Sequence, residues 1–338
     1  MMSLPPPSHS LSSDCTCRKK RFFKKSLIAI ALASALSLTQ AADTLTESSF
    51  VDGVYNASSS QIGSVNFTGN TGSTFTLNPS DPNGTVVIAP SLDSGAAIYI
   101  DGGSSQSTLN ITGSVDISGP EGSRLTTTDS PLIAVGDTKQ GGRLNISGNL
   151  SISNVDVYES SGASVINVGR SQSNGSGSNL TVGNISIDNV TVNNTKSSSP
   201  VTATSILEVT DENSSRPISF TAGDISISNS TAEHVMDFEN AQATTGKILI
   251  EGGSFSRGIY ASTGADVTIG SIEMRGTDLS SSLLLADKDA DLSITSGITV
   301  QGTENDHIQA SGRGDNKLIR FQGAASVNIG GDVKLEYI

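Results

Sequence analysis

Residues 144–154 read LNISGNLSISN, and this eleven-residue phrase decides the fold. Large apolar residues alternate with small polar ones, so the two kinds fall on opposite faces of an extended chain. The apolar positions of the phrase are Leu144, Ile146, Leu150 and Ile152. A Gly-Asn pair interrupts the alternation at the centre, and such residues favour a bend. The phrase therefore predicts two short strands joined by a bend.

The same phrase returns six more times along the chain. Its other copies are LNITGSVDISG (109–119), NLTVGNISIDN (179–189), FTAGDISISNS (220–230), VTIGSIEMRGT (267–277), LSITSGITVQG (292–302) and VNIGGDVKLEY (327–337). Recurrence at a spacing of a few tens of residues is the signature of a repeat array in which each unit stacks on its neighbours.

A second alternating phrase lies between these copies, as in LIAVGD (132–137) and VINVGR (165–170). Its eight anchors are Ile98, Ile133, Ile166, Leu207, Met236, Ile259, Leu283 and Ile319, with spacings of 35, 33, 41, 29, 23, 24 and 36 residues. Each unit thus reads strand, turn, strand, bend, strand, turn. The longer units carry polar insertions at 171–179, 193–205 and 303–317, which we expect at turns outside the stack.

A unit of three short strands with one apolar face cannot fold alone, but it can bury that face by stacking on its copy. The sequence therefore predicts an all-β protein, a right-handed parallel β-helix with about eight regular rungs. Residues 42–90 are expected to add a less regular N-terminal part, and residues 91–338 the regular rungs. A β-propeller needs about 40 residues per blade, which excludes it for units of 23 and 24 residues.

Residues 1–41 are predicted to be a leader with a Sec signal peptide. RKKRFFKK (18–25) is basic, and the next 13 residues, SLIAIALASALSL, are apolar and too few to span a membrane. Cleavage is expected between Ala41 and Ala42. The basic segment follows a Ser/Pro-rich lead, which suggests a start codon downstream of Met1.

The positions of the cysteines and the net charge indicate that the exported part of the chain is cysteine-free and acidic. The two cysteines, Cys15 and Cys17, both precede the apolar run, so the exported part uses no disulfide. Residues 1–41 hold six Lys/Arg and one Asp, a net charge of +5, and the whole chain carries −13, which leaves −18 for the rest. Such a surface repels nucleic acid, so no nucleic-acid partner is expected.

These features together resemble the passenger domains of autotransporters of Gram-negative bacteria, and the pertactin-like passengers in particular. The resemblance covers about residues 26–338 and rests on the signal peptide, the cysteine-free mature chain and the Gly/Ser/Thr/Asn-rich rungs. It implies display on the outer membrane or release, and adhesion to host cells, matrix or sibling cells. It also implies an outer-membrane β-barrel as translocator, which this chain does not contain.

The chain ends inside a rung, at DVKLEYI (332–338), which predicts a fragment, a truncated gene product or a passenger separated from its barrel. A two-partner secreted haemagglutinin-like protein is an alternative, since NPSDPNG (78–84) partly resembles a motif of such proteins.

Catalytic motifs are not evident in the sequence. His234 is expected in a turn or partly buried, and His307 in a solvated insertion. Asp93-Ser94-Gly95 has neither the preceding glycine of a serine-protease motif nor a histidine linked to it. We therefore expect no catalytic residue and no cofactor. A carbohydrate-active β-helix, a lyase or glycosidase, is the enzymatic alternative; it would require clustered carboxylates or a basic residue near a groove, commonly with aromatic platforms for sugars.

Aspartates recur in two patterns, neither of which predicts a metal site. DKDAD, at 287–291, has the spacing that begins an EF-hand loop, but Leu292 and Ile298 stand where that loop needs Gly and Glu. Asp101, Asp137 and Asp211 follow the second phrase, where aspartate favours a turn. Several asparagines of Asn-x-Ser/Thr sequons, among them Asn110, Asn145, Asn149 and Asn184, fall inside the phrases and are interpreted as outward or bend residues.

Arg313-Gly314-Asp315 is the motif with a defined partner class. The tripeptide binds integrins when a loop displays it, and here it lies in the polar insertion 303–317. The sequence therefore predicts a non-enzymatic adhesin or display rod, with this loop as a possible integrin contact.

Overall fold

The computed structural model describes the chain from residue 43 to residue 336 with gaps. The described ranges are 43–57, 61–68, 72–80, 84–91, 95–101, 106–119, 122–136, 141–159, 163–169, 177–194, 204–211, 218–302 and 318–336. Apart from one 3-10 turn, η1 (Glu47–Ser49), every element in these ranges is a β-strand. Within the same ranges, no helix has the length and apolarity to span a membrane.

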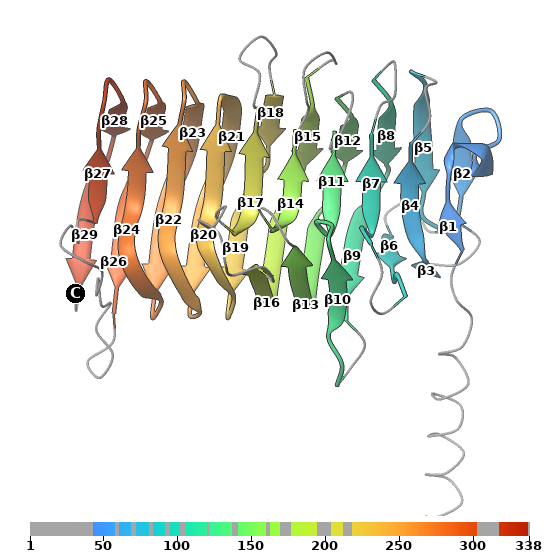
Figure 1. Ribbon diagram of the computed structural model, residues 1–338, viewed down its shortest axis with the longest axis horizontal. Coiled ribbons are helices and arrows are strands. Elements are labelled where there is room, and N and C mark those ends of the chain that lie inside the picture. Colours follow the sequence, from blue (N-terminus) through green and yellow to red (C-terminus); the bar gives the residue numbers. More distant parts are fainter. Residues whose placement is uncertain are drawn as a thin grey trace, which may run out of the picture. The chain divides into compact units, whose positions relative to one another are not determined.

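The strands form parallel ladders that run along a stack of coils, which confirms the predicted parallel β-helix (Figure 1). We call the first ladder face 1; it holds ten strands, so the described residues complete ten coils. Face 1 contains β1 (Thr44–Leu45), β4 (Ser64–Phe67), β7 (Ile98–Ile100), β11 (Ile133–Val135), β14 (Ser164–Val168), β17 (Ser205–Thr210), β20 (Thr231–Glu239), β22 (Ser254–Ser262), β24 (Asp278–Ala286) and β27 (Ile319–Phe321).

Face 2 follows face 1 in every coil. It contains β2 (Val54–Asn56), β5 (Thr74–Asn78), β8 (Thr108–Ile111), β12 (Arg143–Ile146), β15 (Asn179–Val182), β18 (Ile218–Thr221), the first parts of β21 (Ala241–Glu251) and β23 (Asp266–Arg275), β25 (Asp291–Ile294) and β28 (Ser326–Ile329).

Face 3 lies beyond the central bend of the phrase. It contains β3 (Gln61–Ile62), β6 (Thr85–Ile88), β9 (Ser114–Ser118), the first parts of β13 (Leu150–Glu159) and β16 (Ile185–Asn194), β19 (Ile225–Ser228), the second parts of β21 and β23, β26 (Gly297–Gln301) and β29 (Asp332–Glu336). In β21 and β23 the chain passes the bend without leaving the strand.

The structure adds a fourth, shorter ladder that the three-strand unit did not predict. β10 (Leu125–Thr128) pairs with the second part of β13, which pairs in turn with β16, and the first residues of β20, β22 and β24 continue this face 4. Asn154 and Asn189 turn the chain from face 3 into face 4 with φ of 56° and 53°, a left-handed conformation that asparagine tolerates.

The core is the inside of the stack, where apolar residues of successive coils lie directly above one another. Leu144, Ile146, Leu150 and Ile152 are all buried, as the alternation predicts. Residues in register bury the same face in each coil, because a strand's side chains alternate with period two. On face 3 one such row is Val115, Leu150, Ile185, Ile225, Ile248, Ile272 and Ile298.

Seven of the eight predicted anchors lie in one register row of face 1, and the eighth prediction is wrong by one residue. Ile259 pairs with Leu284 rather than Leu283, and Leu284 pairs with Ile319. The register shifts in this pair of strands, because three residues of β24 span what two residues of β22 span. The extra residue is a β-bulge, and both leucines are buried.

The two ends of the described stack differ. At the first coil Phe50 lies against Phe67 and Phe75, with ring centroids 5.4 and 5.3 Å apart, and so covers the end of the core with aromatic surface. In the last coil Phe321, Val333 and Leu335 are exposed.

Candidate functional site

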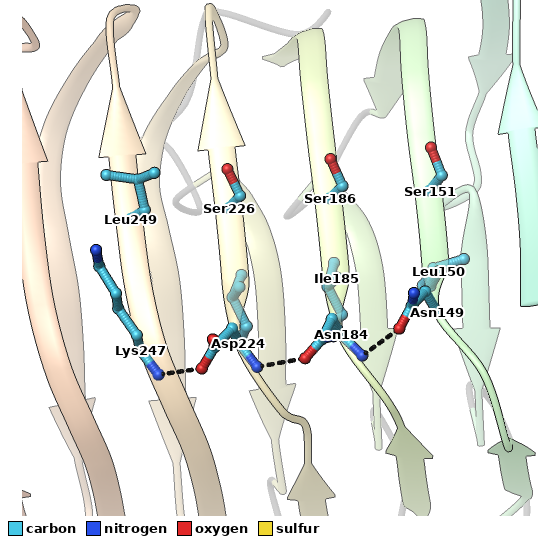
Figure 2. A pocket seen from close by; sticks show the side chains of 11 residues that line it. Asn149, Leu150, Ser151, Asn184, Ile185, Ser186, Asp224, Ser226, Lys247 and Leu249 are labelled. Carbon is cyan, nitrogen blue, oxygen red and sulfur yellow. Dashed lines mark hydrogen bonds between the residues drawn. The ribbon is translucent and has the colours of Figure 1, made fainter.

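The bend between faces 2 and 3 carries a ladder of hydrogen bonds that runs from coil to coil. The backbone N–H of Asn184 donates to Oδ1 of Asn149 (3.1 Å), that of Asp224 to Oδ1 of Asn184 (2.8 Å), and that of Lys247 to Oδ1 of Asp224 (2.8 Å) (Figure 2). Each side chain thus accepts the amide of the next coil. The interpretation of Asn149 and Asn184 as bend residues is confirmed.

A glycine precedes each ladder residue because a side chain has no room there. A Cβ on Gly223 would lie closer than 3.0 Å to Oδ1 of Asn184 and 2.9 Å from the carbonyl oxygen of Gly183. A Cβ on Gly183 would meet the carbonyl oxygen of Gly148 at 2.5 Å. The Gly-Asn or Gly-Asp pair of the phrase is therefore a packing requirement of the bend.

Beside this ladder, the outward surface of face 3 is hollowed. Ser151, Ser186 and Ser226 stand in register on β13, β16 and β19, and the hollow that they line has a volume of about 530 Å³. Leu249 takes the same register position in the next coil. Figure 2 shows the three short hydroxyl side chains in line, followed by the longer Leu249 and Lys247. We call this hollow the serine groove.

A second, smaller hollow of about 270 Å³ continues face 3 beyond Lys247. Glu273 lines it and forms ion pairs with Lys247 and Arg275. The hydrogen bond from Lys247, with a further one from Arg275, holds the pKa of Glu273 below its usual value although partial burial opposes the shift. Lys247 therefore lies between the two hollows and shares the carboxylate of Glu273 with Arg275.

The serine groove combines hydroxyl and amide groups with the apolar side chains of Leu150, Ile185, Ile225 and Leu249, which also line it. Its volume is in the range of small-ligand sites, and it crosses four coils on strands whose backbone is fixed by ladder pairing on both sides. Asp224 is the carboxylate that lines it, and Oδ1 of that residue already accepts a backbone N–H. Hydrolysis of glycosides uses a pair of carboxylates, which the described lining of this groove does not supply.

The residues singled out by their sequence fall partly outside the described ranges. Arg313, Gly314 and Asp315, the cleavage pair Ala41 and Ala42, His307, Asp137, Asp93 and Ser94 all lie outside them. Most of the polar insertions 171–179 and 193–205, and all of 303–317, also lie outside the described ranges. Of the first two insertions, residues 177–179, 193–194 and 204–205 are described. The integrin loop and the cleavage site remain predictions.

Asp101, Asp211 and Asp287 each directly follow a strand of face 1, whereas Asp291 is the first residue of β25, and all four have polar partners. The Tyr99 hydroxyl donates to Oδ2 of Asp101 at 3.4 Å, and Nδ2 of Asn240 donates to Oδ2 of Asp211 at 3.4 Å. Asp287 accepts the backbone N–H of Lys288 (2.8 Å) and Nε2 of Gln322 (2.7 Å), and Asp291 bonds to the Ser326 hydroxyl. In the described ranges, no group of three His, Cys, Asp or Glu side chains is arranged to hold a metal ion.

The structure reveals one cluster of titratable residues that sequence reasoning missed. His234, predicted to lie in a turn or partly buried, is fully buried within strand β20 and lies between Asp237 and Arg257. A signal for the contact was present: His234 stands two residues before the anchor Met236, and Arg257 two before the anchor Ile259. Anchors in register bring residues at equal offsets side by side.

Comparison of the chain with family models, with curated proteins and with solved structures gives no match.

Proposed function

We propose that this chain is the binding rod of an exported, non-enzymatic adhesin that attaches to host cells, matrix or sibling bacterial cells. The observation that carries the proposal is the serine groove, a hollow lined by hydroxyl, amide and apolar groups that crosses four coils of a uniform stack. A stack of this kind holds surface groups at fixed spacing over a long distance, which suits attachment through many weak contacts.

The chemistry of the groove favours recognition of a neutral polar partner. Hydroxyls of Ser151, Ser186 and Ser226 both donate and accept hydrogen bonds, and the adjacent Lys247 is paired with Glu273. A neutral partner needs no counter-charge; the charged residues of the groove are Asp224 and Lys247, and Lys247 is held by Glu273. We infer that the partner offers hydroxyl or amide groups, as surface glycans and extended peptides do.

Export to the cell surface is the second part of the proposal. It rests on the basic and apolar segments at 18–38, on the absence of cysteine after Cys17, and on the resemblance to autotransporter passengers. An outer-membrane β-barrel would then be the translocation partner, and the rod would be displayed with its polar faces outward.

Binding of purified residues 42–338 to epithelial cells, to matrix proteins and to a glycan array tests the proposal. Ser186→Gln fills the groove with a longer side chain, whereas Thr181→Gln makes a comparable change on the outward face of β15 in the same coil; both residues are exposed. Adhesion should fall several-fold in the groove variant and persist in the control. Equal adhesion in both would remove the groove from the proposal.

The loops are tested separately, because recognition often lies in loops on a rigid scaffold. Trimming 303–317 to a Gly-rich turn should leave the stack folded, and Asp315→Glu asks whether an Arg-Gly-Asp contact contributes. Loss of adhesion in Asp315→Glu together with retention in Ser186→Gln would place the function in the loop. If the chain degraded glycans, the carbohydrate-active alternative would replace the adhesin.

A further inference from the structure

A row of polar residues runs through five consecutive coils at the entrance to face 1. In register order it consists of Ser164, Ser205, His234, Arg257 and Ser282. Apart from Arg257, whose side chain is 33% exposed, these residues are buried. The hydroxyls of the three serines and Nε of Arg257 are buried without a hydrogen-bond partner among the described residues. In this row, hydrogen bonds therefore offset only part of the free-energy cost of burying polar groups.

The contacts of His234 define its protonation state. Nη1 of Arg257 lies 2.8 Å from Nε2 of His234, and a guanidinium can only donate hydrogen bonds. Nε2 must therefore be the unprotonated, accepting nitrogen. Nδ1 carries the proton and donates to Oδ2 of Asp237 at 2.9 Å. The imidazole is neutral in this arrangement, in one fixed tautomer.

A second partner for Nε2 is already in place. Oε1 of Glu233 lies 3.8 Å from Nε2 of His234 and 4.0 Å from Nη1 of Arg257. The other groups around the imidazole are the ring of Tyr260, with its centroid 5.5 Å away, and Glu208 of β17, which lies in register beside Asp237. Glu208 accepts a hydrogen bond from Nδ2 of Asn167 at 3.1 Å. Charged groups around the ring are thus three carboxylates and one guanidinium.

We propose that His234 is an acid-sensitive switch that exchanges Arg257 for Glu233 as the partner of Nε2. Proton uptake at Nε2 removes the only lone pair that Arg257 can use and places two N–H groups against each other. A protonated imidazole instead donates to Asp237 and Glu233 at once, a charge-assisted arrangement. Arg257 then turns toward solvent, which also frees its buried, unpartnered Nε.

The expected consequence is weaker pairing between β20 and β22, the two strands that carry His234 and Arg257 at the start of face 1. Histidine is the side chain that proteins commonly use as a sensor of mild acid, so mild acidification is the relevant stimulus.

Nitrogen-15 NMR of the imidazoles in purified residues 42–338 tests the first step, since only His234 and His307 contribute there. At neutral pH, His234 should show the Nδ1–H tautomer, and acidification should convert it to the doubly protonated form. An Nε2–H tautomer at neutral pH would overturn the proposal without any variant being made.

Hydrogen exchange of residues 254–262, corrected for intrinsic rates, tests the second step. Protection should be lost between pH 7 and pH 5 in the wild type and retained in His234→Gln, whose amide can donate to Asp237 and accept from Arg257 but takes up no proton. Glu233→Gln should require more acid for the same loss, because the receiving carboxylate is gone. Equal loss of protection in wild type and His234→Gln would refute the switch; if His234→Gln does not fold, Glu233→Gln with the NMR titration decides.

Discussion

Gly223→Ala should destabilise the stack through a specific clash at the bend between faces 2 and 3. The added Cβ would lie closer than 3.0 Å to Oδ1 of Asn184 and 2.9 Å from the carbonyl oxygen of Gly183. Oδ1 of Asn184 cannot withdraw freely, because it accepts the N–H of Asp224 at 2.8 Å. Overpacking costs about 1 to 3 kcal/mol and the net value of that hydrogen bond is about 1 kcal/mol, so we expect a total loss of about 1 to 4 kcal/mol.

A double-mutant cycle separates the two contacts of the new methyl group. Asn184→Ala alone should cost about 1 kcal/mol, the net value of one hydrogen bond. In that background Gly223→Ala should cost less than in the wild type, since only the carbonyl oxygen of Gly183 remains in the way. Urea denaturation followed by far-UV circular dichroism measures all four proteins.

The matched control is Gly95→Ala, since nothing lies within 4 Å of the position that its Cβ would take. Its φ is not in the left-handed region, so the change should be neutral or slightly stabilising. The packing argument would be refuted if Gly223→Ala were as harmless as this control. It would also fail if the cost were unchanged after removal of the Asn184 side chain.

Three further outcomes are expected. Ile152→Ala, at a fully buried core position, should lower the free energy of unfolding by about 2 to 5 kcal/mol in urea denaturation; a surface-like cost below about 0.5 kcal/mol would contradict its placement. Because the folded-state pKa of Glu273 is lowered from 4.5, its ion pairs stabilise the fold above that pH, and the stabilisation is lost as pH falls through the lowered value. Lys247→Gln should raise the midpoint of Glu273 in a carboxyl NMR titration, and an unmoved midpoint would contradict the hydrogen bond as its cause. Exported protein should begin at or near Ala42 by N-terminal sequencing, and material that retains the basic segment 18–25 would speak against export by a cleaved signal.

The period-two phrase was sufficient to predict the fold because stacking constrains every unit in the same way. A unit that buries one apolar face must repeat that face in the next coil, so Ile133, Ile166 and Leu207 could be aligned by eye. The structure places them in register. The Gly-Asn centre of the phrase was recognised as a bend, but the reason for glycine, a Cβ clash with the coil before it, depends on the spacing of two backbones.

Other features depend on which residue of one coil meets which residue of the next. Ile259 aligns equally well with Leu283 or Leu284 in the sequence, because both are leucines, and only a bulge in β24 selects the second. The fourth face was missed because the eleven-residue phrase stops at Asn154 and Asn189. The segments that follow, VDVYE (155–159) and VTVNN (190–194), alternate as strands do and pair with each other.

The serine groove could not be predicted from a single sequence. Ser151, Ser186 and Ser226 are unremarkable outward residues of three strands, separated by 35 and 40 positions in the chain. A groove arises only because the same register position holds a serine in three consecutive coils and a leucine in the next.

The same reasoning connects the groove with the histidine switch. In a solenoid each coil touches only its two neighbours, so a change at one junction acts first on the coils that share it. His234 and Arg257 join β20 to β22, and β20 runs directly into β21, which carries Lys247 and Leu249 at the end of the serine groove. Loosening of that junction by acid would therefore affect the coil of β21, which contributes Lys247 and Leu249 to the end of the groove. Adhesion measured at pH 7 and pH 5 in the wild type and in His234→Gln would show whether the two sites are coupled. Acid-sensitive binding in the wild type alone would establish the coupling, and an identical pH response in the variant would leave the switch and the groove as independent features of one stack.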